Sequence, residues 1–337
     1  MLFLKLTITA AMCIVLSFFL GAALIPLLRR YNTGRYEPYV GDRFRTDGSE
    51  PAFGGAVTLI VLAFGISVAA SYVTDRKRLL VFALFSALIT AAGIADDVMT
   101  EVQGKACGVK TAVKLGYTYA VCLGTSLTAK FLGLTGSAVL LPFGLGFFEM
   151  GRAYCPVTAV FMTGVIYSFR IMNRFGTDEE TCIGGLTQTV GAVSMLGVSL
   201  VGSITKNEAL TAIGLVGAAA QAGYLLWGLS PSKLRSGSSG GYLTGAMTAS
   251  VITLTDFYQL GMVLTAVSPA ADAVGAAVNY LVYVSRKKLL LRASSLHRHI
   301  SMYKVNDYKV IMIFSAAALA GAAAAAALAA YGQDRYF

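Results

Sequence analysis

The segment Leu79–Asp97, LLVFALFSALITAAGIADD, sets an uncharged apolar run directly before two adjacent carboxylates. About 20 apolar residues are enough to cross the hydrocarbon core of a bilayer. The run therefore predicts a membrane-spanning helix over 79–95, which places Asp96 and Asp97 at a membrane boundary. Adjacent carboxylates there repel each other and resist desolvation, so a cation would stabilise them. The alternative is a helix end with a solvated acidic pair, although carboxylates are unfavourable at that end of the helix dipole.

The composition of the whole chain favours the same class of protein. Hydrophobic side chains make up 56% of the 337 residues and charged side chains only 13%, whereas soluble domains are about half apolar and a quarter charged. Disordered chains lack apolar residues, and one soluble core would have to hide several runs of spanning length. We therefore predict an all-α polytopic membrane protein in which residues 1–337 form a single integral membrane domain.

Apolar runs of spanning length recur along the chain. They predict about ten transmembrane helices, at residues 4–28, 54–72, 79–95, 112–131, 155–172, 183–203, 208–228, 242–266, 270–285 and 308–331. The ninth is the weakest, because Asp272 and Asn279 interrupt it. The first is too long for the apolar region of a signal peptide, so we interpret it as a transmembrane helix.

The positive charges are distributed unevenly between the predicted loops. Of the 27 Lys and Arg residues, 19 lie in odd-numbered loops and eight in even-numbered loops and the termini. Because cytoplasmic loops are enriched in Lys and Arg, we expect a multi-pass cell-membrane protein with odd loops in the cytoplasm and both termini outside. The cluster Arg76–Arg78 is an exception. This distribution explains the net charge of +10 without a nucleic-acid partner. Residues 138–141 and 146–149 favour a short external β-hairpin.

Polar residues gather on the predicted cytoplasmic side. Asp96 and Asp97 would suit Mg²⁺, which prefers hard oxygen ligands and is often shared with substrate phosphates. Lys114, at the start of the fourth span, suits a phosphate as a point charge, unless it only snorkels to the bilayer surface. Asn173 follows the fifth span, and the acidic run Asp178-Glu179-Glu180 beyond it is either a metal-proximal loop or a solvated turn.

Two further segments lie on this predicted side. Gly237-Ser238-Ser239-Gly240-Gly241 is expected to be a flexible turn before the eighth span, whose backbone amides would cradle a phosphate, unless it is a plain loop. The two histidines, His297 and His299, lie in the most basic loop, where they face an anionic substrate or are incidental. Together, the acids, lysine, glycine turn and histidines favour a site for a metal, a phosphorylated substrate and a membrane-embedded acceptor.

The order of these motifs resembles the polyprenyl-phosphate N-acetylhexosamine-1-phosphate transferases, and most of all their phospho-N-acetylmuramoyl-pentapeptide transferase branch, over nearly the whole chain. The matching stretches are Ser49–Gly55 (SEPAFGG, against G-T-P-T-M-G-G), Gly93–Asp97 (against G-x-x-D-D), Gly108–Lys114 (a basic segment), Pro231–Gly240 (against P-A-K and G-D-T-G) and Arg292–His299 (RASSLHRH, against K-M-S-P-L-H-H-H).

The resemblance implies an activity and a set of roles. The activity is transfer of phospho-MurNAc-pentapeptide, or another sugar-1-phosphate, from a UDP-sugar to undecaprenyl phosphate, with release of UMP and with Mg²⁺ as cofactor. The implied roles are acceptor activation by Asp96 and Asp97, metal binding by Asp97 and Asp178, and substrate binding by Lys114, Asn173, His297 and His299. The sugar, the lipid acceptor and the oligomeric state, including a homodimer, stay open.

This chain also departs from the family pattern. Ser238 stands where the family has a magnesium-binding aspartate, and a hydroxyl is a poor replacement for a carboxylate on Mg²⁺. Glu179 or Glu180 would have to supply the missing group. The other departures are Thr100 for a lysine, Leu229 for an asparagine, Arg298 for the central histidine, and Thr181 or Gly184 for a second aspartate.

Two other functions compete with an active transferase. One is a catalytically degenerate relative that binds a lipid phosphate or nucleotide, or regulates an active partner, and the departures favour it. The other is a transporter or channel, which predicts internal repeats or mid-membrane charges. The sequence contains no convincing repeat and its charges lie mostly at span ends, so this hypothesis ranks last.

Overall fold

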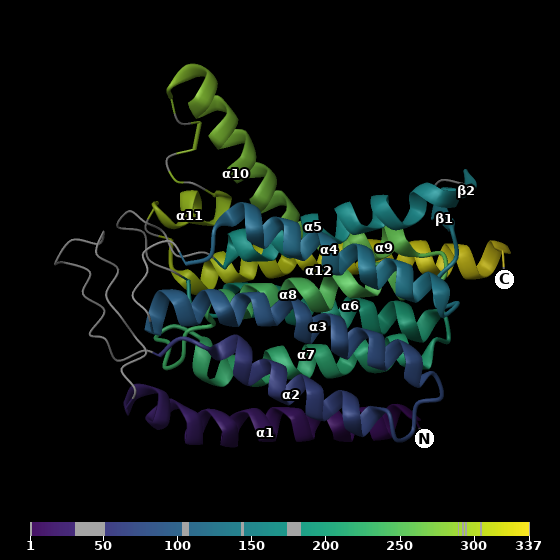
Figure 1. Cartoon of the computed structure of the whole chain (residues 1–337), viewed down its shortest axis with the longest axis horizontal. Coiled ribbons are helices and arrows are strands. Elements are labelled where there is room, and N and C mark those ends of the chain that lie inside the picture. Colours follow the sequence, from purple (N-terminus) through teal and green to yellow (C-terminus); the bar gives the residue numbers. More distant parts are fainter. Residues whose placement is uncertain are drawn as a thin grey trace.

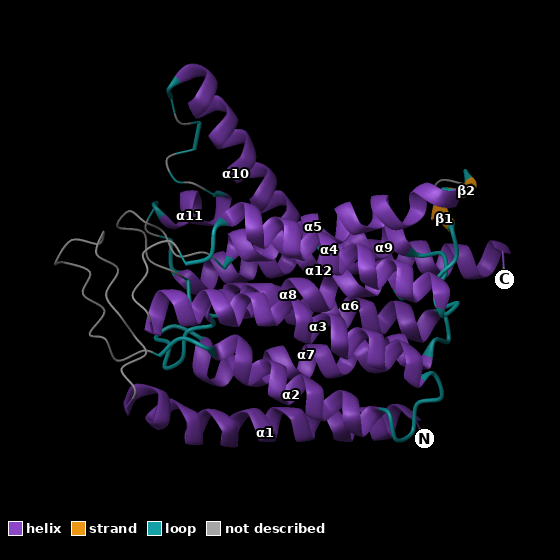
Figure 2. Cartoon of the chain, in the orientation of Figure 1, coloured by secondary structure: helices purple, strands orange, loops and turns teal. Residues whose placement is uncertain are grey.

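The computed structural model of the chain describes residues 2–30, 51–102, 108–142, 145–173, 183–288, 290–291, 293, 295–303 and 305–336. Helices dominate the described residues (Figure 2). They are α1 (Leu2–Arg30), α2 (Gly54–Ala69), α3 (Arg76–Asp97), α4 (Thr111–Phe131), α5 (Tyr154–Met172), α6 (Leu186–Ile204), α7 (Glu208–Gly228), α8 (Gly237–Thr253), α9 (Gln259–Leu264), α10 (Val267–Arg286), α11 (Leu296–Ser301) and α12 (Asp307–Tyr336).

The long helices run side by side in a bundle with its two ends at opposite sides of the molecule (Figure 1). Helix α8 forms the centre, because residues 239–253 are all buried and the helix packs against α3 and α5. The N- and C-termini both lie at one end, which we call the terminal end. Helix α10 leaves the bundle obliquely, and α11 lies beside it at the opposite end.

The apolar helices identify a membrane protein. Within the described ranges, six helical segments are long and apolar enough to span a bilayer: Leu2–Arg30, Arg76–Thr100, Gly151–Met172, Leu186–Ile204, Glu208–Gly228 and Asp307–Arg335. Helices α2 and α8 fall short of spanning length, at 16 and 17 residues. Helices α4 and α10 are long enough but are not apolar enough to join this group. The six segments confirm the predicted class without confirming all ten predicted spans.

The predicted eighth span, 242–266, is wrong as a single helix. Helix α8 ends at Thr253 and α9 begins only at Gln259. Long-range contacts hold the intervening backbone open: the Phe257 carbonyl accepts from the Leu140 backbone N–H at 2.9 Å, and the Thr255 carbonyl accepts from the Thr135 hydroxyl at 3.2 Å. The sequence stays apolar through this break. Hydropathy could not predict the break, because hydrogen-bond partners from elsewhere in the chain cause it.

The predicted β-hairpin is confirmed. Strands β1 (Ala138–Leu141) and β2 (Gly146–Glu149) pair antiparallel, with Ala138 opposite Glu149 and Leu141 opposite Gly146. The hairpin lies at the terminal end of the bundle (Figure 1). The same contact from Leu140 to Phe257 that opens the α8–α9 break ties the hairpin to the bundle.

Within the basic cluster Arg76–Arg78, which is an exception to the predicted charge distribution, Arg78 has a structural role. The Arg78 guanidinium lies 2.8 Å from Asp256 Oδ1 and 3.4 Å from Asp75 Oδ2, and it also donates to the Leu134 carbonyl at 3.3 Å. Arg78 is thus neutralised by two acids and holds the α8–α9 break against the start of α3. The positive charge of Arg78 is therefore explained by its ion pairs with Asp75 and Asp256. A count of Lys and Arg in the loops does not detect such ion pairs.

Candidate functional site

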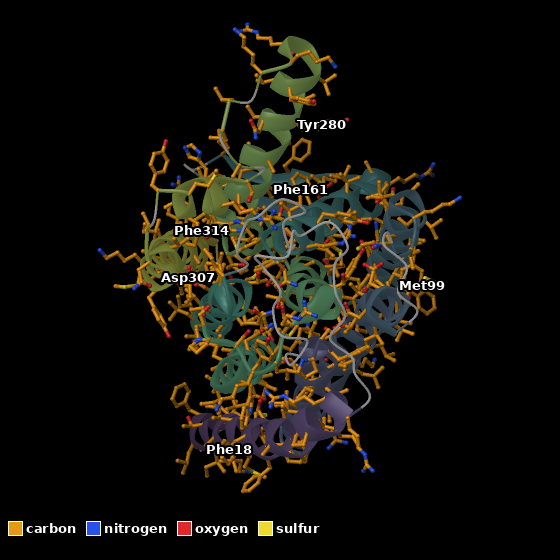
Figure 3. All side chains as sticks on the ribbon, turned by 90° about the vertical axis from the view of Figure 1, so that its left-hand side faces the viewer. Phe18, Met99, Phe161, Tyr280, Asp307 and Phe314 are labelled. Atoms are coloured by element: carbon orange, nitrogen blue, oxygen red, sulfur yellow. The ribbon has the colours of Figure 1, made fainter. Side chains whose placement is uncertain are left out.

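The predicted acidic pair lies where α3 ends beside the start of α8. Asp96 and Asp97 form the last turn of α3, and both are buried, with 4% and 3% of their surfaces exposed. Figure 3 looks onto this end of the bundle, where Met99, two residues beyond Asp97, and Asp307, at the start of α12, are labelled. We call this the site end, opposite the terminal end.

Asp97 is bound by the N-terminus of α8. Its Oδ1 accepts from the Ser238 backbone N–H at 2.6 Å, and its Oδ2 accepts from the Ser239 backbone N–H at 3.0 Å. The first backbone amides of a helix lack intrahelical acceptors and carry the positive end of the helix dipole. The sequence left two interpretations of this segment open: a plain loop, which it favoured, and a flexible turn whose amides cradle a phosphate. In the structure the turn is instead the first turn of α8, and a carboxylate of the protein accepts from these amides.

Asp96 is compensated by a lysine. Lys114 Nζ lies 2.5 Å from Asp96 Oδ1, which also accepts from the Val109 backbone N–H at 3.0 Å. The Ser238 hydroxyl donates to Asp96 Oδ2 at 2.9 Å. Only 5% of Lys114 is exposed, so the alternative of a snorkelling lysine does not apply. The predicted acid and the predicted phosphate-binding lysine are thus direct partners.

Two glycines allow the acidic pair to reach α8. A Cβ on Gly55 would overlap the backbone of Ser239 and Gly240, and a Cβ on Gly93 would come within 2.6 Å of Ser239 Cα. The start of α2 is also fastened to this turn, because the Gly55 N–H donates to the Ser236 carbonyl at 3.0 Å. The glycines in these two sequence motifs therefore allow α2 and α3 to pack closely on α8.

Asn173 belongs to the same cluster. It follows α5, donates through Nδ2 to the Gly237 carbonyl at 2.7 Å, and accepts at Oδ1 from the Ser236 hydroxyl at 2.8 Å. Both ends of its amide thus hold the turn that presents the α8 amides. The observed contacts of Asn173 hold the first turn of α8 in place. Its contact with a substrate stays a prediction.

His297 forms a second polar cluster, between α10 and α11. Its Nδ1 lies 2.8 Å from Asp272 Oδ2, and its backbone N–H donates to Asp272 Oδ1 at 2.9 Å. Asp272 is fully buried, and the sequence did not predict this pairing, because there Asp272 indicated only an interruption of the ninth span. His299 does not join this pair; its ring meets Tyr303 edge to face, with 5.3 Å between centroids.

The remaining acidic residues of the predicted site lie outside the described residues. These are Asp178, Glu179 and Glu180, together with Thr181. Their predicted roles at the metal therefore stay predictions.

Within the described residues the carboxylates of Asp96 and Asp97 are already fully hydrogen-bonded to protein donors. All four of their oxygens accept such bonds, and the pair is already compensated by Lys114 and the helix N-terminus. Nowhere in the described ranges do three or more His, Cys, Asp or Glu side chains group as metal ligands would. The prediction of Mg²⁺ at Asp97 and Asp178 remains a prediction, because Asp178 is not described.

These features define a class: a helical membrane protein with a buried, charge-compensated acidic pair at one end of its bundle. Residues 79–256 match the family described as glycosyl transferase family 4, and the chain belongs to this family. The matched segment contains the whole cluster around Asp96 and Asp97 and ends before the Asp272–His297 pair.

Relatives named phospho-N-acetylmuramoyl-pentapeptide-transferase match nearly the whole chain at low identity. The protein from Desulfitobacterium hafniense is 23% identical over 323 residues, covering 94% of this chain and 95% of its own length. Those from Carboxydothermus hydrogenoformans and Clostridium beijerinckii are 24% and 21% identical, covering 90% and 92% of this chain and 93% and 92% of their own lengths. The family match identifies the chain as a transferase. Its long apolar helices indicate that this transferase is a membrane protein.

Proposed function

We propose that the chain transfers a sugar-1-phosphate from a UDP-sugar to a polyprenyl phosphate in the cell membrane and releases UMP. The first transfer to test is that of phospho-MurNAc-pentapeptide from its UDP derivative to undecaprenyl phosphate. The names of the relatives include this transferred group. This choice makes the protein part of peptidoglycan biosynthesis. The observation that carries the proposal is the buried cluster in which Asp96 pairs with Lys114 and Asp97 binds the α8 amides.

The proposed reaction needs charge compensation and alignment more than covalent chemistry by the protein. An oxygen of the lipid phosphate attacks the β-phosphorus of the UDP-sugar, the bond from that phosphorus to the bridging oxygen breaks, and UMP leaves with the bridging oxygen. Lys114 is the cation for an incoming phosphate. When Lys114 turns from Asp96 to that phosphate, the Asp96 carboxylate is freed to accept a proton from the acceptor.

The membrane arrangement of the bundle supports the same proposal. We infer that the chain crosses the membrane about ten times, with α2, α4, α8 and α10 completing the six apolar segments, and with the site end in the cytoplasm. The hairpin and both termini then lie outside. Support comes from the position of the acidic pair at the end opposite both termini (Figure 1). A cytoplasmic site would meet water-soluble UDP-sugars where the lipid phosphate reaches the membrane surface.

The test is transfer of label from radiolabelled UDP-sugars to undecaprenyl phosphate by the purified protein in detergent, with Mg²⁺ and with EDTA. A panel including UDP-MurNAc-pentapeptide and UDP-N-acetylglucosamine identifies the sugar. Label in the lipid phase and stoichiometric UMP support the proposal. No product from any sugar, beside an active relative in the same preparation, overturns it.

A second candidate function is supported by Ser238. Its hydroxyl donates to Asp96 and its backbone N–H donates to Asp97, so the position where the family has an aspartate now supplies hydrogen-bond donors to the acidic pair. This arrangement favours a catalytically degenerate relative that retains lipid or nucleotide binding or regulates a partner. In that case Ser238→Asp combined with Leu229→Asn creates activity that the wild type lacks. A wild-type protein that already turns over rules out this candidate.

A further inference from the structure

Arg170 lies on α5, one helical turn before Asn173, between two tyrosine rings. Its guanidinium carbon is 5.3 Å from the Tyr167 ring centroid and 5.2 Å from the Tyr242 ring centroid. The two rings meet edge to face, with 6.3 Å between centroids. Cation–π contacts of this kind fix the orientation of a guanidinium and leave its N–H groups available.

The charge on Arg170 has no acid partner in the described part of the chain. Two other cations there do: Arg78 and Lys114 both form ion pairs. Arg170 is half-buried, and its guanidinium carries five N–H donors that can bind an anion. The described fold thus provides a positioned positive charge without its counter-charge.

Within the described residues the two tyrosine hydroxyls have no acceptor beyond each other. Tyr242 is fully buried; neither its hydroxyl nor that of Tyr167 makes a hydrogen bond of good geometry there, and the two hydroxyls interact only with each other. Buried hydroxyl groups are normally hydrogen-bonded. A guanidinium and two hydroxyls that share one place, with no acceptor from another residue in the described part of the chain, indicate a ligand rich in acceptor oxygens.

This place adjoins the acidic cluster. The Tyr242 ring lies against Gly93, one turn before Asp97 on α3, because a Cβ on Gly93 would come within 3.0 Å of it. On α5, Arg170 precedes Asn173, which holds the α8 turn. One turn of helix corresponds to about 5 Å along the axis. The Arg170 site is therefore one turn deeper in the bundle than the acidic pair.

We propose that Arg170, Tyr167 and Tyr242 form an oxyanion-binding site that takes a phosphate group. A phosphate has enough acceptor oxygens for a two-point contact with the guanidinium and for the two hydroxyls. The assignment of that phosphate to a substrate rests on the proposed function, while the site itself rests only on the grouping of these three donors in the described part of the chain. Its source is either a nucleotide or a lipid phosphate, and the test distinguishes them.

The test measures dissociation constants of UMP and of farnesyl phosphate for the purified protein in detergent by isothermal titration. Loss of a charge-assisted contact weakens binding by about 10- to 100-fold. We expect this loss for Arg170→Gln, and a smaller one for Arg170→Lys, which keeps the charge but not the planar fork. The matched control is Arg152→Gln, at an exposed arginine of the terminal end, which is expected to bind like the wild type.

Tyr242→Phe separates ligand binding from a structural role. The substitution keeps the ring beside Arg170 and removes only the hydroxyl, which makes no hydrogen bond of good geometry within the described residues. We expect an unchanged or higher melting temperature without ligand and a reduced stabilisation by the bound phosphate. A Tyr242→Phe protein that melts lower but binds phosphate as the wild type does would show that the hydroxyl is structural. That result overturns the site, and this variant decides the question if Arg170→Gln fails to fold.

The two ligands give distinct outcomes. Weaker binding of UMP alone assigns the site to the nucleotide, and weaker binding of farnesyl phosphate alone assigns it to the lipid. Wild-type affinity for both ligands in Arg170→Gln, or no binding of either by the wild type at millimolar concentration, overturns the site. Arg170-dependent binding without any transfer reaction would refute the proposed function and leave this site standing.

Discussion

Asp96 and Asp97 are neighbours in the chain, yet their charges are compensated in different ways. Asp96 relies on the Lys114 ammonium, and Asp97 relies on two backbone amides of α8. Buried ion pairs give little net stability, but removing one partner leaves a buried charge without compensation. Each compensating group can therefore be tested by its removal.

Lys114→Met leaves Asp96 buried beside Asp97 without its cation. We expect the free energy of unfolding to fall by about 3–5 kcal/mol, the usual cost of breaking a buried pair. The measurement is SDS-induced unfolding of the purified protein. Lys110→Met, at an exposed lysine one turn earlier, is the control and should stay within about 0.5 kcal/mol of the wild type. Equal stability of the two variants would contradict a buried pair.

Asp272→Asn tests the second polar cluster. Asp272 accepts from both the backbone and the ring of His297, and hydrogen bonds to charged groups contribute about 1.5–3 kcal/mol each. We expect α11 to lose its attachment to α10, with a comparable fall in the free energy of unfolding. Asp334→Asn, at an exposed acid of α12, provides the comparison. A variant as stable as this control would show that the Asp272–His297 contact is dispensable.

At the residue scale, the sequence predicted which side chains share an end of the molecule but not how they pair. Asp96, Lys114 and Asn173 were placed together because each lies at a span end on the predicted cytoplasmic side. Their pairing depends on side-chain reach across helices, which charge patterns do not encode. Asp272 was missed because its partner is 25 residues away and an acid inside a weak span indicates only a polar interruption.

At the element scale, the approach of α2 and α3 to α8 depends on glycine. Gly55→Ala is expected to lower the free energy of unfolding by about 1–3 kcal/mol, because its methyl group would overlap the backbone of α8. Gly124→Ala on α4 meets no neighbour within 4 Å. This control should be neutral or stabilising by up to about 1 kcal/mol, since alanine favours a helix. Thermal unfolding of both variants measures the contrast, and a tolerated Gly55→Ala would refute the close approach.

The helix boundaries show what a sequence can predict at this scale. Helix α7, Glu208–Gly228, has the predicted bounds because local signals set them: the Asn207 side chain accepts from the Leu210 N–H at its start. The predicted span 242–266 failed because the break at its centre comes from hydrogen bonds with Thr135 and Leu140. A capping residue lies next to its helix in the sequence, so a local pattern reveals it. The tertiary partners of the break lie far away in the sequence, and no local pattern indicates the pairing.

At the scale of the whole molecule, the bundle separates a site end from a terminal end. In a variant without its five native cysteines, Lys110→Cys and Lys206→Cys place a thiol at each end, and both positions are exposed. We expect a membrane-impermeant maleimide to label Lys206→Cys in intact cells and Lys110→Cys only after lysis. Labelling of both in intact cells would contradict the proposed orientation.

The most direct test of the proposed function compares transfer by the wild type and by Asp97→Asn at equal concentrations of folded protein. Asp97 lies at the centre of the cluster, bound to the first turn of α8. Wild-type protein is predicted to move labelled sugar-1-phosphate to undecaprenyl phosphate, and Asp97→Asn to do so about 100-fold more slowly or worse. Equal rates for the two proteins, or no transfer by the wild type beside an active relative, would contradict the account.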